Sequence, residues 1–163
     1  MDAMPELRDA VREEAAIIAD VIRRSYADVA PRFGLTPGNA PTHPSNCEPS
    51  WVERGLDRGD PYVVARVDEV PVGCVSLWRR SDRPIEMRRL AVLPEHRRRG
   101  YGRELFDAAI ERARTLGADV VDVSLIADNV ELADWYRRLG CVETGRARYD
   151  SVPFEVLHMT YTL

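Results

Sequence analysis

The sequence predicts an α/β sandwich built on one mixed β-sheet, and three observations lead to this fold class. Runs rich in β-branched residues alternate with segments whose apolar residues recur at helical spacing. From residue 85 onward these segments follow in the order strand, helix, strand, helix and hairpin, which is typical of α/β domains. The 163 residues are 45% hydrophobic, enough for the core of one domain spanning residues 1–163.

The N-terminal third is predicted to hold one short strand and two helices around an irregular loop. A strand is expected at 5–9, and apolar residues at helical spacing predict a helix at 15–29. Five prolines and two glycines predict a long irregular loop over 31–49, and long loops inside compact domains are often functional. The Ser-Trp-Val-Glu segment at 50–53 has the pattern of a capping box and predicts a helix over 51–58.

The remaining two-thirds of the chain alternates between strands and helices. In chain order we expect strands at 62–67, 72–78 and 85–93, a helix at 101–116, a strand at 120–126, a helix at 130–139, and a closing hairpin of strands 141–148 and 154–162. The turn residues at 68–71 predict that the first two of these strands form an antiparallel hairpin. Because a helix connects strand 85–93 to strand 120–126, these two strands should be parallel.

Composition and charge exclude several classes of function. The net charge of −4 and the pI near 5.5 argue against a nucleic-acid partner. No apolar run approaches the roughly 20 residues of a membrane span, and residues 1–6 lack the basic and apolar regions of a signal peptide. The three cysteines are odd in number and widely spaced, which suits reduced thiols. We therefore expect a cytoplasmic protein with no membrane and no nucleic-acid partner.

The segment that follows strand 85–93 has the features of an anion site. A proline and a short basic loop lead to Gly100 and Gly102, which open the next helix. Unpaired backbone N–H groups and the positive end of the helix dipole converge at such a helix N-terminus. Neither glycine has a side chain to keep a phosphate away from the backbone. Four arginines are expected to add mobile positive charge at the rim: Arg97, Arg98, Arg99 and Arg103.

This loop is predicted to bind a phosphorylated cofactor. The basic cluster has two other interpretations, a nucleic-acid patch and a solvated run of charges. The cofactor is favoured because the cluster is short, stands in an acidic chain and has no interleaved aromatic residues on which bases could stack. The loop does not match a P-loop, and it lacks the third glycine of a dinucleotide-binding fingerprint.

The motif Arg97-x-x-Gly100-x-Gly102 resembles the pyrophosphate-binding motif of the GCN5-related N-acetyltransferases, the GNAT family. The preceding Leu90-Ala91-Val92-x-Pro94 is similar to the family's cofactor-binding strand, and residues 129–140 are similar to its following helix. The resemblance implies a mixed β-sheet flanked by helices on both faces, a splayed cofactor-binding strand and a C-terminal hairpin. It also implies acetyl-CoA as cosubstrate. The implied cofactor-binding residues are Leu90, Ala91, Val92, Arg97, Arg98, Arg99, Gly100, Tyr101, Gly102, Arg103 and Asn129.

The resemblance also implies how acetyl transfer is catalysed. Backbone N–H groups of Leu90 and Val92 would polarise the acetyl carbonyl, and Asn129 would contact the pantetheine arm. Glu86 matches the family's general base; four residues before Leu90 on one strand, it is expected to share a face with it. Tyr136 matches the tyrosine that protonates the departing thiolate. The structural alternatives are a solvated strand residue for Glu86, a packed core side chain for Tyr136 and a helix N-cap for Asn129.

By resemblance, the acceptor is a primary amine that receives the acetyl group directly in a ternary complex. Segments 30–50 and 146–154 are expected to shape its site, and a carboxylate such as Asp150 can attract a cationic amine. His43 and Cys47 are too few to hold a metal, so none is expected. Two alternatives stay open: transfer of a longer acyl chain, and a non-catalytic acyl-CoA-binding sensor of the same fold. Edge strands of such folds often pair between subunits, so a homodimer is one expected assembly.

Overall fold

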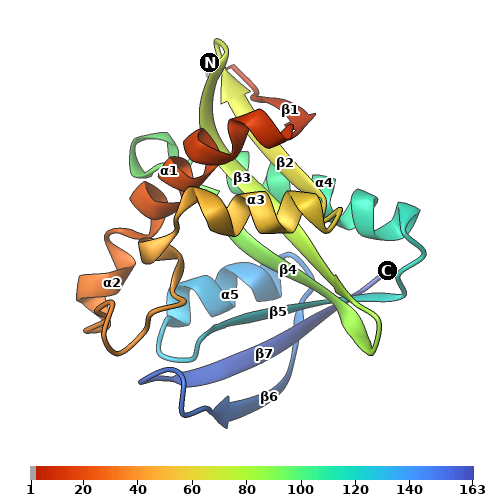
Figure 1. Cartoon of the computed structure of the whole chain (residues 1–163). Helices are drawn as coiled ribbons and strands as arrows, with labels where there is room; N and C mark the ends of the chain where they lie inside the picture. The colour runs from red at the N-terminus through yellow and green to blue at the C-terminus, as the bar shows by residue number, and fades with distance from the viewer. Residues whose placement is uncertain (1–2) are drawn as a thin grey trace.

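The computed structural model describes residues 3–163 and shows one seven-stranded sheet between helices (Figure 1). The strands are β1 Glu6–Asp9, β2 Tyr62–Val67, β3 Val70–Arg80, β4 Arg83–Val92, β5 Val120–Ile126, β6 Val142–Arg148 and β7 Glu155–Thr162. The helices are α1 Ala15–Tyr26, α2 Val29–Arg32, α3 Pro49–Asp57, α4 Tyr101–Thr115 and α5 Val130–Arg138. The strand order is β1-β2-β3-β4-β5-β7-β6, and only β4 and β5 pair in parallel. The predicted mixed α/β fold is confirmed.

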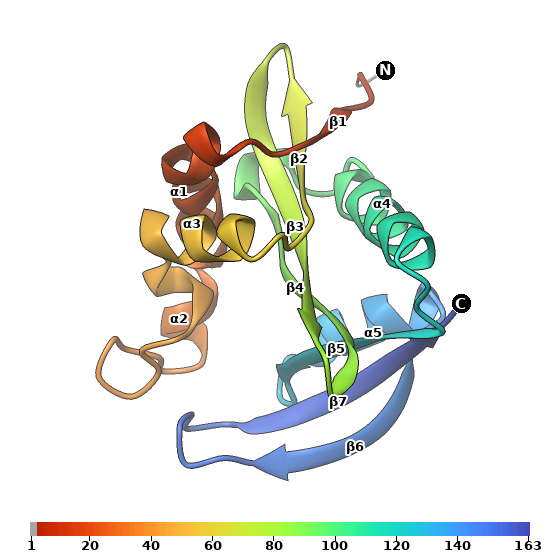
Figure 2. The same cartoon turned by 45° about the vertical axis from the view of Figure 1, so that its right-hand side comes forward.

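The helices cover both faces of the sheet (Figure 2). Helices α1 and α3 bury one set of side chains, including Ile18 and Val52, and helices α4 and α5 bury another, including Phe106. Neighbouring residues of β2 divide between the two sets: Val63 packs beneath α4 and Val64 packs beneath α1. This is the alternation that a strand buried on both faces requires. Within residues 3–163, no helix is both long and apolar enough to span a membrane.

The predicted capping box before the second helix is wrong. Helix α3 begins at Pro49, its N-cap is Glu48, and no side chain caps it. Ser50 therefore lies inside the first turn. Proline is favoured at this position because its missing N–H has no partner in the first turn and its ring holds φ near the helical value. The helix predicted over 15–29 is also divided, since α1 ends at Tyr26 and α2 follows.

The first hairpin is tighter than expected. Strand β3 begins at Val70, so the turn between β2 and β3 consists of Asp68 and Glu69 alone. Both residues have positive φ, 49° and 67°, as a two-residue type I′ turn requires. Strands β3 and β4 then run together as a long hairpin whose tip lies between Arg80 and Arg83. The second strand of this hairpin, β4, is the strand predicted to bind the cofactor, and it lies in the middle of the sheet.

Strands β4 and β5 separate soon after they meet. Their parallel pairing is confined to Ile85 with Val121 and Glu86 with Asp122. Strand β5 instead pairs along its whole length with β7. From Met87 onward the inner edge of β4 therefore lacks a neighbouring strand, and the splayed strand that the sequence predicted is confirmed.

Candidate active site

A β-bulge lies in the splayed part of β4. Arg88 pairs with Ser76 and Ala91 with Cys74, so Arg89 and Leu90 together face a single residue of β3. Arg89 accommodates the extra residue of the bulge by adopting the left-handed backbone conformation, with φ of 55°. Its guanidinium donates to the Tyr62 hydroxyl (2.6 Å) beneath α1 and α3.

The bulge corrects the expectation that Glu86 and Leu90 share a face. Met87 and Leu90 both pack against the cluster beneath α4 and α5, although Leu90 is the third residue after Met87, whereas Ala91 packs beneath α1. Glu86 precedes Met87 in a regular part of the strand, so it faces the α1 and α3 side. Sequence spacing missed this because a single inserted residue reverses the alternation downstream.

The backbone of β4 presents donors to the gap beside it. The carbonyl of Leu90 accepts from the Tyr26 hydroxyl (2.8 Å), and the carbonyl of Val92 accepts from Arg97 Nε (3.2 Å). Neither partner belongs to β3, so both residues turn their polar groups away from it. In a strand the N–H and C=O of one residue point to the same side. The amides of Leu90 and Val92 therefore point into the space that β5 leaves open.

A cavity of about 350 Å³ and another of about 310 Å³ meet at this place. The smaller, here called the splay cavity, lies between β4, the end of β5 and the start of α5. Its lining includes Leu90, Asn129 and Tyr136 together with Glu86. The splay thus opens a groove that runs past both residues predicted to be catalytic.

The loop before α4 has the geometry of an anion site. Gly100 is the N-cap of α4 and has φ of 84°, a conformation that strongly favours glycine. The first backbone bond into the helix runs from Glu104 N–H to the Gly100 carbonyl (3.1 Å). The amides of the first turn, at residues 101–103, have no carbonyl below them to bond. These donors lie at the positive end of a 15-residue helix.

Gly102 has a packing role that the sequence did not indicate. A Cβ at this position would lie 3.3 Å from Trp135 Cζ2, so the missing side chain lets α5 approach the start of α4. No equivalent contact exists at Gly100, where a Cβ would meet nothing within 4 Å. The two glycines therefore serve different purposes, close packing at one and backbone conformation at the other.

The expectation that four arginines form a mobile rim is wrong for Arg97. Its guanidinium donates to the Asp28 carboxylate (2.7 Å), to the Ser25 carbonyl (2.6 Å) and to the Val92 carbonyl. Arg97 therefore ties the loop to the end of α1 and to β4. Hydrogen bonding to this guanidinium holds the pKa of the Asp28 carboxyl below its usual range. Arg98, Arg99 and Arg103 are exposed, and Arg103 Nε lies 3.7 Å from the Asp107 carboxylate.

Tyr136 lies on α5 and is 8% exposed. Its ring packs against Phe106 and Trp135, and its hydroxyl has no hydrogen-bond partner within residues 3–163. Burial, followed by the nearby phenol of Tyr26, raises the pKa of Tyr136 well above the ordinary value. The hydroxyl is therefore protonated near neutral pH, and Tyr136 lines a cavity in which its hydroxyl can donate.

Glu86 and Asn129 lie at opposite ends of the splay. Glu86 pairs with Trp78 on one side and Asp122 on the other, and its carboxylate is 3.7 Å from Arg88 Nε. Asn129 is the N-cap of α5 and its Oδ1 accepts from Leu132 N–H (3.4 Å). The alternative interpretation of Asn129 as a cap is thus confirmed, and the same residue lines the cavity.

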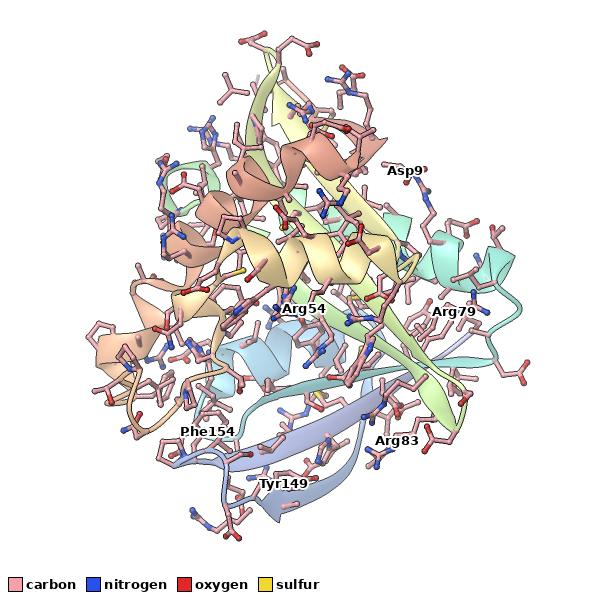
Figure 3. All side chains as sticks on the ribbon, in the orientation of Figure 1. Asp9, Arg54, Arg79, Arg83, Tyr149 and Phe154 are labelled. Carbon is pink, nitrogen blue, oxygen red and sulfur yellow. The ribbon has the colours of Figure 1, made fainter. Side chains whose placement is uncertain are left out.

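The segments expected to shape the acceptor site do border the splay cavity. Residues 42–44 come from the first segment, and Val152 and Phe154 from the second; Figure 3 shows Phe154 on the loop before β7. Asp150 is not among the lining residues of either cavity. His43 Nδ1 accepts from Ser45 N–H (3.3 Å), and Cys47 is buried beneath α1. In the part of the chain that the structure describes, no three metal-ligating side chains come together.

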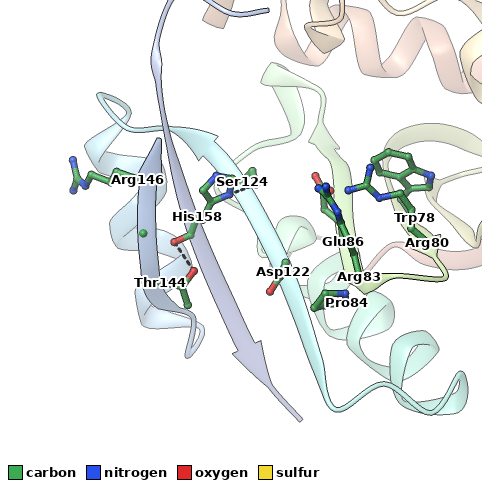
Figure 4. A pocket seen from close by; sticks show the side chains of 11 residues that line it. Trp78, Arg80, Arg83, Pro84, Glu86, Asp122, Ser124, Thr144, Arg146 and His158 are labelled. Carbon is green, nitrogen blue, oxygen red and sulfur yellow. Dashed lines mark hydrogen bonds between the residues drawn. The ribbon is translucent and has the colours of Figure 1, made fainter. Parts of the chain in front are cut away.

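The larger cavity, here called the hairpin cavity, is a site that the sequence did not predict. It lies between the tip of the β3–β4 hairpin and strands β5, β6 and β7 (Figure 4). Figure 4 shows Trp78, Arg80, Arg83 and Glu86 along one wall, with Asp122, Ser124 and His158 opposite. These residues come from four strands, so no local motif could have shown that they meet. The pair Arg79-Arg80 followed by Arg83 was the available signal, an excess of positive charge in one turn of an acidic chain.

A hydrogen-bonded chain of side chains begins on the wall of the hairpin cavity that β5 and β7 form. Ser124 Oγ lies 2.9 Å from His158 Nδ1, and the Tyr149 hydroxyl lies 2.8 Å from His158 Nε2. His158 stands opposite Ser124 in the pairing of β5 with β7, which explains the contact. Both ring nitrogens of His158 are thus engaged by hydroxyl groups.

Comparison with known proteins gives one family. A profile of the Acetyltransferase (GNAT) family matches residues 26–141. A curated relative, the N-acetyltransferase YvbK of Bacillus subtilis (strain 168), is 28% identical over 89 residues. That alignment covers 55% of this chain, and the chain spans little more than half (57%) of the relative's length.

Solved structures share the fold over nearly the whole chain. A ribosomal-protein-alanine N-acetyltransferase from Brucella melitensis superposes with a TM-score of 0.73 at 21% identity, covering 97% of this chain and 99% of its own. The protein yncA from Salmonella typhimurium, solved with acetyl-CoA, gives 0.71 at 20% identity, with 99% and 95% covered. The paia N-acetyltransferase from Thermoplasma acidophilum, solved with coenzyme A, gives 0.73 at 15% identity, with 99% and 100% covered. At these identities the likeness establishes the fold.

Proposed function

This chain belongs to the GNAT acetyltransferase family, and we propose that it transfers the acetyl group of acetyl-CoA to a primary amine within a ternary complex. One observation carries the proposal. The splay of β5 from β4 leaves the amides of Leu90 and Val92 without a neighbouring strand, and the cavity beside Leu90 is also lined by Tyr136 and Glu86. An acyl group held there would meet fixed hydrogen-bond donors and both proton-transfer groups.

The residues of the site fit acetyl-CoA. The first turn of α4 and the left-handed Gly100 form a concave set of donors for a pyrophosphate. Exposed Arg98, Arg99 and Arg103 supply positive charge beside it. The 310 Å³ splay cavity lies along residues 86–90 of β4 and suits an extended arm with amide groups. When bound, acetyl-CoA supplies a thioester carbon for attack and a thiolate as leaving group.

Each catalytic task then has a candidate in this chain. Glu86 accepts a proton from the ammonium of the acceptor, directly or through water, which frees the nitrogen lone pair. The amides of Leu90 and Val92 stabilise negative charge on the acetyl oxygen while the new C–N bond forms. Tyr136 donates its proton to the sulfur as the C–S bond breaks, and the second proton that the nitrogen loses on becoming an amide restores the Tyr136 hydroxyl, directly or through water.

Binding is tested first, by calorimetric titration with acetyl-CoA and with desulfo-CoA. We expect micromolar affinity for acetyl-CoA and a large loss in Gly100→Val, because valine is strained at φ of 84° and covers the amides. Absence of binding by the parent protein would refute the proposed function.

Catalysis is tested with Tyr136→Phe, which keeps the buried ring and removes only the hydroxyl. The general-acid role predicts a fall in kcat of about 10²- to 10⁴-fold with little change in acetyl-CoA affinity. Tyr161→Phe is the matched control, because Tyr161 packs on the same Phe106 ring but lines neither cavity. Equal kcat values for the two variants would remove Tyr136 from the mechanism.

Glu86→Gln is expected to lower kcat most at low pH, where less of the acceptor is already deprotonated.

A further inference from the structure

We propose that the hairpin cavity binds the acceptor and selects an amine that also carries a carboxylate or a comparable anionic group. This inference rests on the proposed function and specifies its acceptor. It follows from the position of the cavity, from the charges that line it and from the partners those charges have.

The hairpin cavity adjoins the splay cavity. The hairpin cavity and the splay cavity share two lining residues, Glu86 and Ser124. A molecule in the hairpin cavity therefore reaches the proposed general base without entering the groove assigned to acetyl-CoA. At about 350 Å³ the cavity has the size of a small metabolite. Its amine would lie at Glu86, and the rest of the molecule would extend toward the tip of the β3–β4 hairpin.

Two arginines line this end of the cavity without a carboxylate partner. Neither Arg80 nor Arg83 forms an ion pair within residues 3–163. The Arg80 guanidinium is stacked 4.2 Å from the centre of the Trp78 ring, which holds it in place. A third arginine of the cavity, Arg146, is paired with Glu143 (2.8 Å) and points away from the others in Figure 4.

The carboxylates of the cavity do not compensate these charges. Asp122 lies on the opposite wall and accepts from the Thr160 hydroxyl (2.7 Å). Glu86 already has Arg88 as its cationic neighbour, and the Arg88 guanidinium stacks on the Trp78 ring at 4.2 Å. The part of the cavity beside Arg80 and Arg83 is therefore positively charged, whereas the part beside Glu86 is negatively charged.

This charge arrangement fits one class of acceptor. An ammonium group beside Glu86 and an anionic group beside Arg80 and Arg83 would each meet an opposite charge. Guanidinium groups bind carboxylates and phosphates through paired N–H donors, which favours such anions over neutral polar groups. A polyamine would place a second cation beside the two arginines and would be repelled.

Arg80 and Arg83 keep their charge over the whole pH range of an assay. All 23 basic residues of the chain are arginines, and no lysine occurs. A guanidinium does not lose its proton in proteins, so selectivity for an anionic acceptor should not depend on titration of these groups.

The test compares amino acids with their carboxamides. Alanine, leucine and phenylalanine are each assayed against the corresponding carboxamide, with spermidine as a polycation, by release of CoA from acetyl-CoA. The preference for the carboxylate form is then measured again in Arg80→Gln and Arg83→Gln. Arg79→Gln is the control, because Arg79, labelled in Figure 3, is the neighbouring arginine of β3 and is not among the residues that line the cavity. Comparing preferences between parent and variant cancels the different intrinsic reactivity of the two amines.

We expect kcat/KM to favour the carboxylate form of at least one pair. That preference should fall about tenfold or more in Arg80→Gln and Arg83→Gln and stay unchanged in Arg79→Gln. The same ranking should appear in calorimetric titration of the CoA-loaded protein, a readout that does not require turnover. Equal or better use of carboxamides or spermidine, or a preference that survives both substitutions, would overturn the inference. Loss of acetyl-CoA binding by the parent would instead overturn the proposed function.

Discussion

Burial determines the chemistry of single side chains around this site. The Tyr136 hydroxyl keeps its proton because charge on it would be poorly solvated, and the same physics acts on the thiols. Cys47, Cys74 and Cys141 are 0%, 1% and 3% exposed. Burial raises the pKa of all three thiols, to about 12 for Cys74 and about 11 for Cys141. The thiolate, the reactive form, is thus scarce in the folded chain.

The folded protein should therefore react slowly with thiol reagents. At pH 8 we expect Ellman's reagent to detect almost no thiol in the native protein and three thiols after unfolding in urea. The measurement is the absorbance time course with and without urea. Rapid reaction of one thiol in the native state would show that its surroundings open readily. A slow reaction would let the same reagent report released CoA in the activity assay.

His43 predicts how folding responds to acid. Burial lowers the pKa of His43, and its Nδ1 accepts a backbone N–H, which a protonated ring cannot do. Since the folded pKa lies below the unfolded value near 6.5, this group's contribution is fully present above about pH 6.5 and is lost as pH falls through the folded pKa. Urea unfolding at pH 7.5 and 5.5 should show a larger loss of stability for the parent than for His43→Gln. Equal losses would exclude this role of His43.

Among the elements, β4 departs furthest from what the sequence predicts. The run Leu90-Ala91-Val92 identified this strand, and the glycine loop predicted an anion site beside it, because both are local patterns. The bulge at Arg89 left no such pattern, since a positive φ at an arginine is imposed by the surrounding strands. The capping box failed for a related reason: Pro49 began the helix one residue before the serine. Local propensity located these elements, and their neighbours fixed the details.

The pairing of β3 with β4 also predicts which glycine the sheet cannot replace. A Cβ at Gly73 would lie 2.7 Å from the Ala91 carbonyl oxygen and 3.1 Å from Leu105 Cδ1. Gly73→Ala should therefore force β4 or α4 to move and reduce the free energy of unfolding by about 2 kcal/mol.

Gly145→Ala on the edge strand β6 is the control, because a Cβ there meets nothing within 4 Å. Its free energy of unfolding should stay within about 0.5 kcal/mol of the parent value. Urea titrations followed by circular dichroism give both values. A Gly73→Ala variant as stable as Gly145→Ala would mean that β3 and β4 adjust without cost.

At the scale of the whole molecule, one sheet joins two layers of helices. The order of elements and the fold class could be predicted from the sequence, because hydrophobic periodicity is a local pattern that is read without knowing which residues are in contact. The hairpin cavity did not follow, since its walls come from residues as far apart as Trp78 and His158. The expected homodimer stays a prediction. Strand β6 is the free edge on its side of the sheet, and it carries Glu143, Arg146 and Arg148, charges that discourage indiscriminate edge pairing.

The shared sheet predicts cooperative unfolding of both helical layers. Trp51 lies in α3 and packs with the cluster beneath α1, whereas Trp135 lies in α5 on the other face. Because the same strands complete both clusters, neither layer should persist without the other. Variants that keep only Trp51 or only Trp135 should show coincident urea midpoints by fluorescence. Two separate midpoints would divide the predicted single domain into independent units.

The absence of lysine has a consequence beyond the charge of the hairpin cavity. Thioesters acetylate free amines without any enzyme, and a protein that concentrates such a reagent at its surface exposes its own side chains to it first. This chain offers no side-chain amine, and its thiols are buried. Self-acetylation on a lysine side chain is therefore impossible in this chain, so an acetyl-lysine recovered from a reaction mixture must come from another molecule.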